Sequence, residues 1–145
     1  AGAPWKTQEQ VRHVMNTLYH AGADGLCGNE DMGQMSAWYV LSAMGFYPVA
    51  PGQNVYTIGS PTFSKVTIQL DQSFGNAAKF VIEAKNNSKE NKYIQSATLN
   101  GKPLNNPWFD HSVIKNGSTL VFVMGPQPNK SWGSDKNSAP PSMTK

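Results

Sequence analysis

The chain has 145 residues, of which 39% are hydrophobic, and its twelve lysine and arginine residues outnumber nine acidic ones to give a formal net charge of +3. This composition suits a soluble fold of one domain or two small ones. The basic residues are scattered, which argues against nucleic acid as a partner, and no apolar run reaches the roughly 18 residues of a membrane-spanning segment.

The first part of the chain predicts an amphipathic helix. Apolar residues recur at helical spacing between residues 11 and 19, which places them on one stripe. Thr7 and Gln10 predict a capping box at the start, and Pro4 suits the first turn of a longer version. The stripe consists of Val11, Val14, Met15, Leu18 and Tyr19.

A second helix is predicted over residues 31–44, ended by Gly45 and then Pro48. Its apolar residues surround most of the helix, so we expect it to be buried. Two helices cannot bury this surface by themselves, and we expect partner helices upstream. The chain is therefore interpreted as a truncated piece of a longer protein, with any targeting signal upstream.

Short extended segments follow, separated by turn residues. The dipeptide at residues 100–101, Asn-Gly, predicts a type I′ hairpin, and the final strand looks buried on both faces. The predicted strands cover residues 55–58, 65–70, 79–84, 93–99 and 118–124.

The expected fold class is α+β, in three parts. Residues 1–48 form helices, residues 49–128 form an antiparallel β-sheet or small β-sandwich, and residues 129–145 form an irregular tail.

A candidate site lies between the two predicted helices. Asn29, Glu30 and Asp31 follow a glycine-containing loop and come directly before the apolar helix. The simplest interpretation is helix capping by acidic residues that complement the helix dipole. Three such side chains exceed what one cap needs, and buried carboxylates require a metal, a sugar hydroxyl or an activated water as partner. A functional site is the alternative interpretation.

This region resembles a known family. Residues 28–40, Gly-Asn-Glu-Asp-Met-Gly-Gln-Met-Ser-Ala-Trp-Tyr-Val, are similar to the C-terminal signature of the glycoside hydrolase family 92 α-mannosidases. The resemblance extends to residues 1–8, 45–48 and 58–61, and it is strong over about the first 70 residues.

The resemblance implies a fold and an activity. The helices would close an (α/α)6 barrel, and the parent enzyme would be an inverting exo-α-mannosidase, of α-1,2 linkage preference, acting on terminal α-mannosyl residues of N-glycan-type mannosides. Its expected partners are a mannose-containing glycan and the remainder of the parent polypeptide, and its expected location is periplasmic or secreted.

The resemblance also implies site residues. Asp31 would be the general base and a ligand of one calcium ion, with Asn29 and Glu30 as supporting substrate-binding residues. Glu30 remains a competitor for the role of base. The general acid and the other calcium ligands would lie upstream, so the chain alone is expected to be inactive.

A binding function is the alternative to an enzyme. In that hypothesis the β-rich segment after residue 48 is a non-catalytic carbohydrate-binding module with aromatic side chains exposed on one sheet face. The remaining candidate residues are structural: Cys27 is predicted to be a buried small hydrophobe, and the three histidines have no metal-binding spacing.

Overall fold

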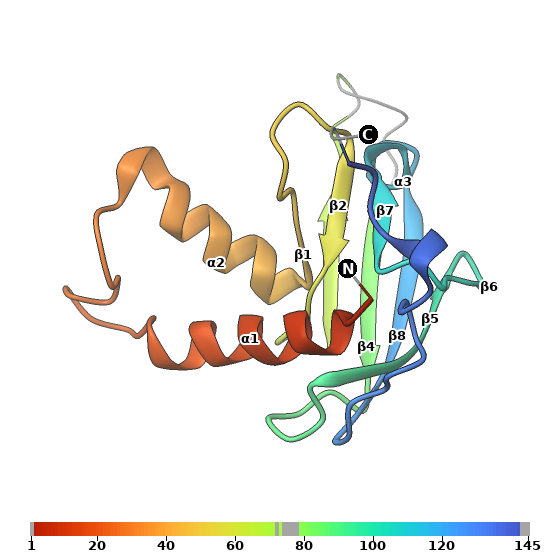
Figure 1. Ribbon diagram of the computed structural model, residues 1–145. Helices are drawn as coiled ribbons and strands as arrows, with labels where there is room; N and C mark the ends of the chain where they lie inside the picture. Colours follow the sequence, from red (N-terminus) through yellow and green to blue (C-terminus); the bar gives the residue numbers. More distant parts are fainter. Residues whose placement is uncertain (1, 72, 74–78, 143–145) are drawn as a thin grey trace.

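Two helices lead into two β-sheets that pack face to face (Figure 1). The computed structural model describes residues 2–71, 73 and 79–142, so residue 1 and the last three residues of the predicted tail lie outside the described residues. The α+β class is confirmed, with the helices first and the sheets after them. No described helix has both the length and the apolar character to cross a membrane.

Helix α1 (Pro4–Thr17) starts at its proline. Proline is favoured there because it has no N–H to leave unpaired and its φ is already helical. The predicted capping box is wrong, since the N-cap is Ala3 and no side chain caps the helix. The predicted stripe is also partly wrong: Leu18 is 43% exposed, and the buried positions include two polar residues, Gln8 and Arg12.

The polar residues of α1 attach the helix to the sheets. Gln8 Oε1 accepts a hydrogen bond from the backbone N–H of Ile94 at 2.9 Å. Arg12 donates from Nε to Ser60 Oγ at 3.0 Å, and from Nη2 to the Pro61 carbonyl and to Asn87 Oδ1. Burying a polar group without a hydrogen-bond partner is costly. These hydrogen bonds therefore fix the position of α1 on the β-rich part.

Helix α2 (Gln34–Met44) begins three residues later than predicted. A 3₁₀ turn, Asp31–Gly33, comes first, and Met32 and Gly33 have φ values of 54° and 83° that break the helical path. The predicted end is confirmed, because Gly45 is left-handed at φ 105° and its N–H bonds back to the carbonyls of residues 41 and 42.

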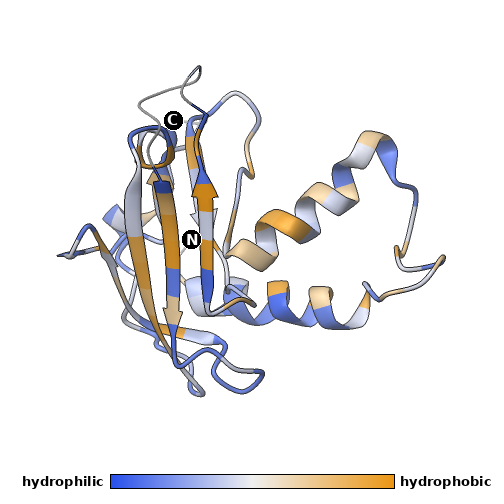
Figure 2. Ribbon diagram, turned by 180° about the vertical axis from the view of Figure 1, so that it is seen from behind, coloured by the Kyte–Doolittle hydropathy of each residue, from blue (hydrophilic) through white to orange (hydrophobic). Residues whose placement is uncertain are grey.

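The expected burial of α2 is wrong for this chain. Only Ser42 and Ala43 of the helix are buried, while Val40 is 49% exposed. Ala43 contacts the segment that follows β2, where the Thr62 N–H donates to the Ala43 carbonyl at 2.9 Å. Leu41 and Met44 are half-buried against the hydrophobic core, whereas Tyr39 and Val40 stay exposed. Figure 2 shows that apolar residues recur along the two helices of the arm.

The smaller sheet has the order β1–β2–β7 and is antiparallel throughout. The larger sheet has the order β3–β4–β8–β5–β6, in which β4 and β8 are parallel and the other pairs antiparallel. The strands are β1 (Phe46–Tyr47), β2 (Val55–Ile58), β3 (Lys65–Gln69), β4 (Lys79–Lys85), β5 (Tyr93–Leu99), β6 (Lys102–Pro103), β7 (Trp108–Asp110) and β8 (Ser118–Gly125). Helix α3 (His111–Lys115) connects β7 to β8.

All five predicted strands are present, with bounds that differ by at most one residue at an end. The predicted hairpin is confirmed, because Asn100 and Gly101 both have positive φ, as a type I′ turn requires, and Leu99 pairs with Lys102. Strand β8 is less buried than expected: Leu120 and Phe122 are buried on one face, while the other face is half-buried.

The hydrophobic core lies between the two sheets. Each central strand contributes every second residue, as a strand with one face toward the core must. Phe46 and Phe109 of the smaller sheet meet Phe80 of the larger one with ring centroids 6.2 and 5.8 Å apart. The boundary predicted at residue 48 stays a prediction, although Phe46 already belongs to this core.

The described part of the tail wraps the surface of the sandwich. Trp132 is buried, and its indole N–H donates to the Leu104 carbonyl at 2.9 Å. Trp108 in turn donates to the carbonyl of Ser138 at 3.1 Å, the last residue of the 3₁₀ turn Lys136–Ser138. Two indole N–H groups therefore hold the tail against the sandwich.

Gly45 gives a prediction about stability. A Cβ at this position would lie 3.0 Å from Pro61 Cβ, and the residue must adopt a left-handed φ. Gly45→Ala should therefore destabilise the chain by about 2 kcal/mol, the upper end of the left-handed penalty, measured by urea unfolding. Gly52→Ala is the matched control, because Gly52 also has positive φ but a Cβ there would have no neighbour within 4 Å. Equal losses for the two variants would contradict the steric explanation.

Candidate functional site

The three candidate residues lie in the segment that joins α1 to α2, at the tip of the helical arm and away from the sheets (Figure 1). A short loop precedes them. Tyr19 and Leu26 form an antiparallel bridge across it, and the His20 N–H donates to the Gly25 carbonyl at 3.2 Å. Gly25 must be glycine, because a Cβ there would collide with the His20 carbonyl oxygen.

Glu30 caps α2 from four residues upstream. Its carboxylate accepts the Ser36 backbone N–H, with 3.2 Å to each oxygen, and the Ser36 hydroxyl at 2.8 Å. Ser36 is the third residue of α2, whose N–H has no partner within the helix. The left-handed turn at Met32 and Gly33 brings Glu30 back over this helix end.

Asp31 and Asn29 are placed differently. Both are exposed, and within the described residues no hydrogen bond or ion pair to either side chain is present. Asp31 lies in the 3₁₀ turn rather than in the first turn of α2. The expectation of carboxylates buried at the start of a buried helix is therefore wrong for this chain, because that helix end is itself exposed.

The residues of this segment match only part of what calcium requires. Calcium takes about six to eight oxygen ligands, of the kind that carboxylates and amide carbonyls supply. Asn29 and Asp31 offer oxygens of this type. No cluster of three or more His, Cys, Asp or Glu side chains able to hold a metal is found among the residues that the structure describes.

Tyr19 contacts the chain on both sides of the segment that carries the candidate residues. Its ring stacks on Trp38 at 5.6 Å between centroids and contacts Tyr39 at 5.0 Å, and its hydroxyl donates to the Met35 carbonyl at 3.4 Å. Burial, followed by the charges of Cys27, Glu30 and Tyr47, raises the pKa of Tyr19. The hydroxyl therefore stays protonated at neutral pH.

Other predicted residues fall outside the candidate site or differ from expectation. Cys27 is exposed, so its predicted burial is wrong; it lies in the same loop, which packs against little else in the described chain. His20 pairs with Asp24 at 3.8 Å on the surface, and His111 contacts the Tyr56 hydroxyl at 3.0 Å.

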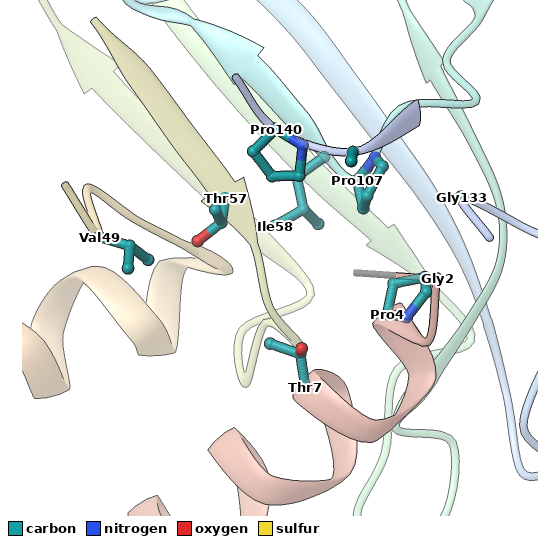
Figure 3. Close-up of a pocket in the computed structure, with 10 residues that line it drawn as sticks. Gly2, Pro4, Thr7, Val49, Thr57, Ile58, Pro107, Gly133 and Pro140 are labelled. Atoms are coloured by element: carbon teal, nitrogen blue, oxygen red, sulfur yellow. The ribbon is translucent and has the colours of Figure 1, made fainter. Parts of the chain in front are cut away.

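Two hollows differ in their relation to the candidate site. One, of about 190 Å³, lies between the start of α1, β2 and the tail, where Pro4, Thr57 and Pro107 line it (Figure 3). Its lining contains no titratable side chain, so it cannot supply an acid or a base. The other, about 560 Å³ and open, is lined by Tyr19, Tyr39 and the loop before Leu26, next to the candidate residues.

Sequence reasoning missed two contributors. Ser36 is not among the predicted site residues, although a Glu–Ser pair across a glycine-containing turn can indicate a cap. Tyr19 was assigned to the apolar stripe of α1, whereas it lies beyond the helix end and contacts α2.

The chain is similar to known glycosidases in sequence and in structure. A protein of Arthroderma benhamiae described as an uncharacterized secreted glycosidase is 36% identical over 99% of this chain, which covers 18% of that protein. Two solved structures from Bacteroides thetaiotaomicron match at least as closely in sequence. A family GH92 inverting mannosidase is 45% identical, with a TM-score of 0.89 over 99% of this chain and 19% of that one. A family GH92 α-mannosidase in complex with mannoimidazole is 37% identical, with a TM-score of 0.88 over 97% of this chain and 18% of that one.

These relatives are glycoside hydrolases. The family described as the glycosyl hydrolase family 92 catalytic domain matches residues 1–126, which is most of the chain. The chain belongs to glycoside hydrolase family 92. It spans about a fifth of the length of the relatives it matches.

Proposed function

We propose that this chain is the C-terminal part of an inverting exo-α-mannosidase that hydrolyses terminal α-mannosyl residues of N-glycan-type mannosides, with α-1,2 linkages as the preferred substrate. Asp31 is its general base. The observation that carries the proposal is the family match over residues 1–126, which includes the candidate site and extends through the β-rich part.

Asp31 is better suited to this role than Glu30. Glu30 is engaged by three hydrogen bonds from Ser36, whereas the Asp31 carboxylate is exposed and has no partner within the described residues. A general base needs an accessible carboxylate that can accept a proton from water. Asn29, also exposed, is proposed as a substrate-binding residue, while Glu30 serves the cap.

The chemistry requires a second carboxyl group. In an inverting glycosidase one carboxyl group protonates the leaving oxygen, and a carboxylate on the opposite face of the sugar takes a proton from the attacking water. In this proposal Asp31 holds and deprotonates that water. The acid belongs to the remainder of the enzyme, so the chain alone does not catalyse the reaction.

The parent enzyme is proposed to contain calcium. Asp31 supplies one oxygen ligand, and the remainder of the enzyme supplies the ligands that this chain lacks. When bound, such an ion would polarise and orient sugar hydroxyl groups. Location in the periplasm or outside the cell is proposed as well, supported by the relative described as secreted.

Removal of calcium tests the cofactor. The full-length enzyme, dialysed against a chelator, should lose mannose release because the ion's oxygen ligands alone cannot orient the sugar hydroxyls. Release of mannose from an α-mannoside is measured before and after calcium is restored, with magnesium as the control ion. Turnover that persists in the chelated enzyme would contradict the calcium assignment.

The structure does not favour the alternative, a separate carbohydrate-binding module. Such a module would present aromatic side chains on an exposed sheet face, yet among the described residues outside the helical arm the exposed large aromatic residue is Phe63, in the loop between β2 and β3. The β-rich part is also bonded to α1 through the buried Gln8 and Arg12.

A further inference from the structure

The segment that carries the candidate residues is held at both of its ends by one residue, Tyr19. Before the segment, the backbone of Tyr19 pairs with Leu26. After it, the Tyr19 hydroxyl bonds to the Met35 carbonyl, and the Tyr19 ring packs on Trp38 and Tyr39 of α2. Residues 27–34, with Asp31 among them, lie between these two attachments.

Few other contacts hold this segment. Asn29 and Asp31 have no side-chain partner within the described residues, and Met32 is fully exposed. The bonds from Ser36 to Glu30 fix the second half of the segment onto α2, but they do not connect it to α1. Within the chain, therefore, the relation of the segment to α1 depends on Tyr19 and the short loop that it closes.

Helix α1 is itself firmly placed. Arg12 and Gln8 bond to the β-rich part at buried positions, and Met15 is 3% exposed. Tyr19 lies two residues after the end of α1, so the position of its backbone is set by that helix. From there its ring reaches Trp38 of α2. Aromatic pairs of this kind are directional as well as apolar, which suits them to fix a separation.

We propose that Tyr19 is a positioning residue that fixes the Asp31 segment relative to α1, so that the Asp31 carboxylate is held where it can deprotonate the attacking water. The inference rests on the proposed role of Asp31. Tyr19 does not touch the substrate in this proposal; it acts through Asp31.

The ring carries most of the effect. The bond from the hydroxyl to Met35 is long at 3.4 Å, whereas two ring contacts lie at 5.0 and 5.6 Å between centroids. Tyr19→Phe in the full-length enzyme should therefore retain kcat within about threefold, since a bond of that length is weak. Tyr19→Leu and Tyr19→Ala should lower kcat by about 10- to 100-fold with little change in KM, because a displacement of about 1 Å can cost 100-fold.

A double-mutant cycle separates positioning from a general structural role. The single variants Tyr19→Leu and Asp31→Asn and the double variant are assayed for mannose release from an aryl α-mannoside, at a temperature where circular dichroism shows each to be folded. If Tyr19 acts through Asp31, Tyr19→Leu has no further effect once Asp31 is Asn. Tyr56→Ala is the matched control, because Tyr56 also stacks on an aromatic ring, Phe109, at 5.5 Å but lies in the sandwich.

Each result is decisive. Unchanged kcat in both Tyr19→Leu and Tyr19→Ala would overturn the inference, as would a loss from Tyr19→Leu that is equally large in the Asp31→Asn background. A loss in Tyr56→Ala as large as in Tyr19→Leu would also overturn it, because any disturbed aromatic pair would then have the same effect. Activity of Asp31→Asn within about tenfold of wild type would defeat the proposed function first, and this inference with it.

Discussion

Asp31→Asn in the full-length enzyme should lower kcat/KM on an α-mannoside by about 10²- to 10⁴-fold, the range expected when a general base is lost. Asparagine keeps the size of the side chain and one acceptor oxygen, but it cannot take a proton from water. Asp31 is exposed in this chain and makes no side-chain bond within the described residues, so the substitution disturbs no bond that supports the fold. Steady-state kinetics on a mannoside, with the unfolding temperature measured in parallel, gives the comparison.

Glu30→Gln is the matched control for this substitution. It removes a neighbouring carboxylate of the same loop while leaving an oxygen that can still accept from Ser36. We expect its activity to stay within about tenfold of wild type, because the proposed role of Glu30 is the cap and not proton transfer. The opposite pattern, an inactive Glu30→Gln and an active Asp31→Asn, would assign the base to Glu30.

The strands were predictable because their signals are local. Residues 65–70 alternate apolar and polar side chains, as a half-buried strand does, and residues 93–99 are followed by an Asn-Gly pair, which allows the chain few alternatives to a type I′ hairpin. The short strands β1, β6 and β7 gave no such signal. Two- and three-residue strands form where neighbouring segments offer them a pairing edge, and that depends on the assembled sheet.

The geometry of the candidate site was less accessible to sequence reasoning. The pattern located the polar residues at a helix start correctly, but it did not place the left-handed turn at Met32, where a non-glycine residue adopts φ 54°. Single residues of this kind are rare, and propensity disfavours them. The cap from Glu30 to Ser36 depends on that turn, so it could not be inferred without it.

The face of α1 was mispredicted for a different reason. Hydrophobic periodicity assumes that buried positions are apolar, whereas the buried face of α1 includes Gln8, at 1% exposure, and Arg12, at 6%. Their partners, Ile94 and Ser60, lie 86 and 48 residues away in the chain. No local pattern indicates a buried polar side chain whose hydrogen-bond partner comes from so distant a segment.

Arg12→Met should therefore destabilise the chain by about 2 to 6 kcal/mol, since two of its acceptors are buried and each, left without its donor, costs about 1–3 kcal/mol. Methionine fills much of the same space but donates to none of the three acceptors, Ser60 Oγ, the Pro61 carbonyl and Asn87 Oδ1. Burial already lowers the pKa of Arg12, which shows that the charged form is held at some cost and that its neutral acceptors offset that cost.

Lys6→Met is the matched control for Arg12→Met, because Lys6 is an exposed cation on the same helix whose contact is with the Trp5 ring at 5.4 Å. An exposed contact of that kind contributes about 1 kcal/mol at most.

Urea unfolding, followed both by tryptophan fluorescence and by circular dichroism, measures the two variants. If α1 and the sandwich form one cooperative unit, Arg12→Met shifts a single transition seen by both probes. Two separate transitions, with the transition of the sandwich unchanged by Arg12→Met, would instead favour a domain boundary near residue 48. That result would support the hypothesis of an independent module. The buried bonds from α1 to Ser60 and Ile94 cross that position, and they are the physical reason to expect one transition.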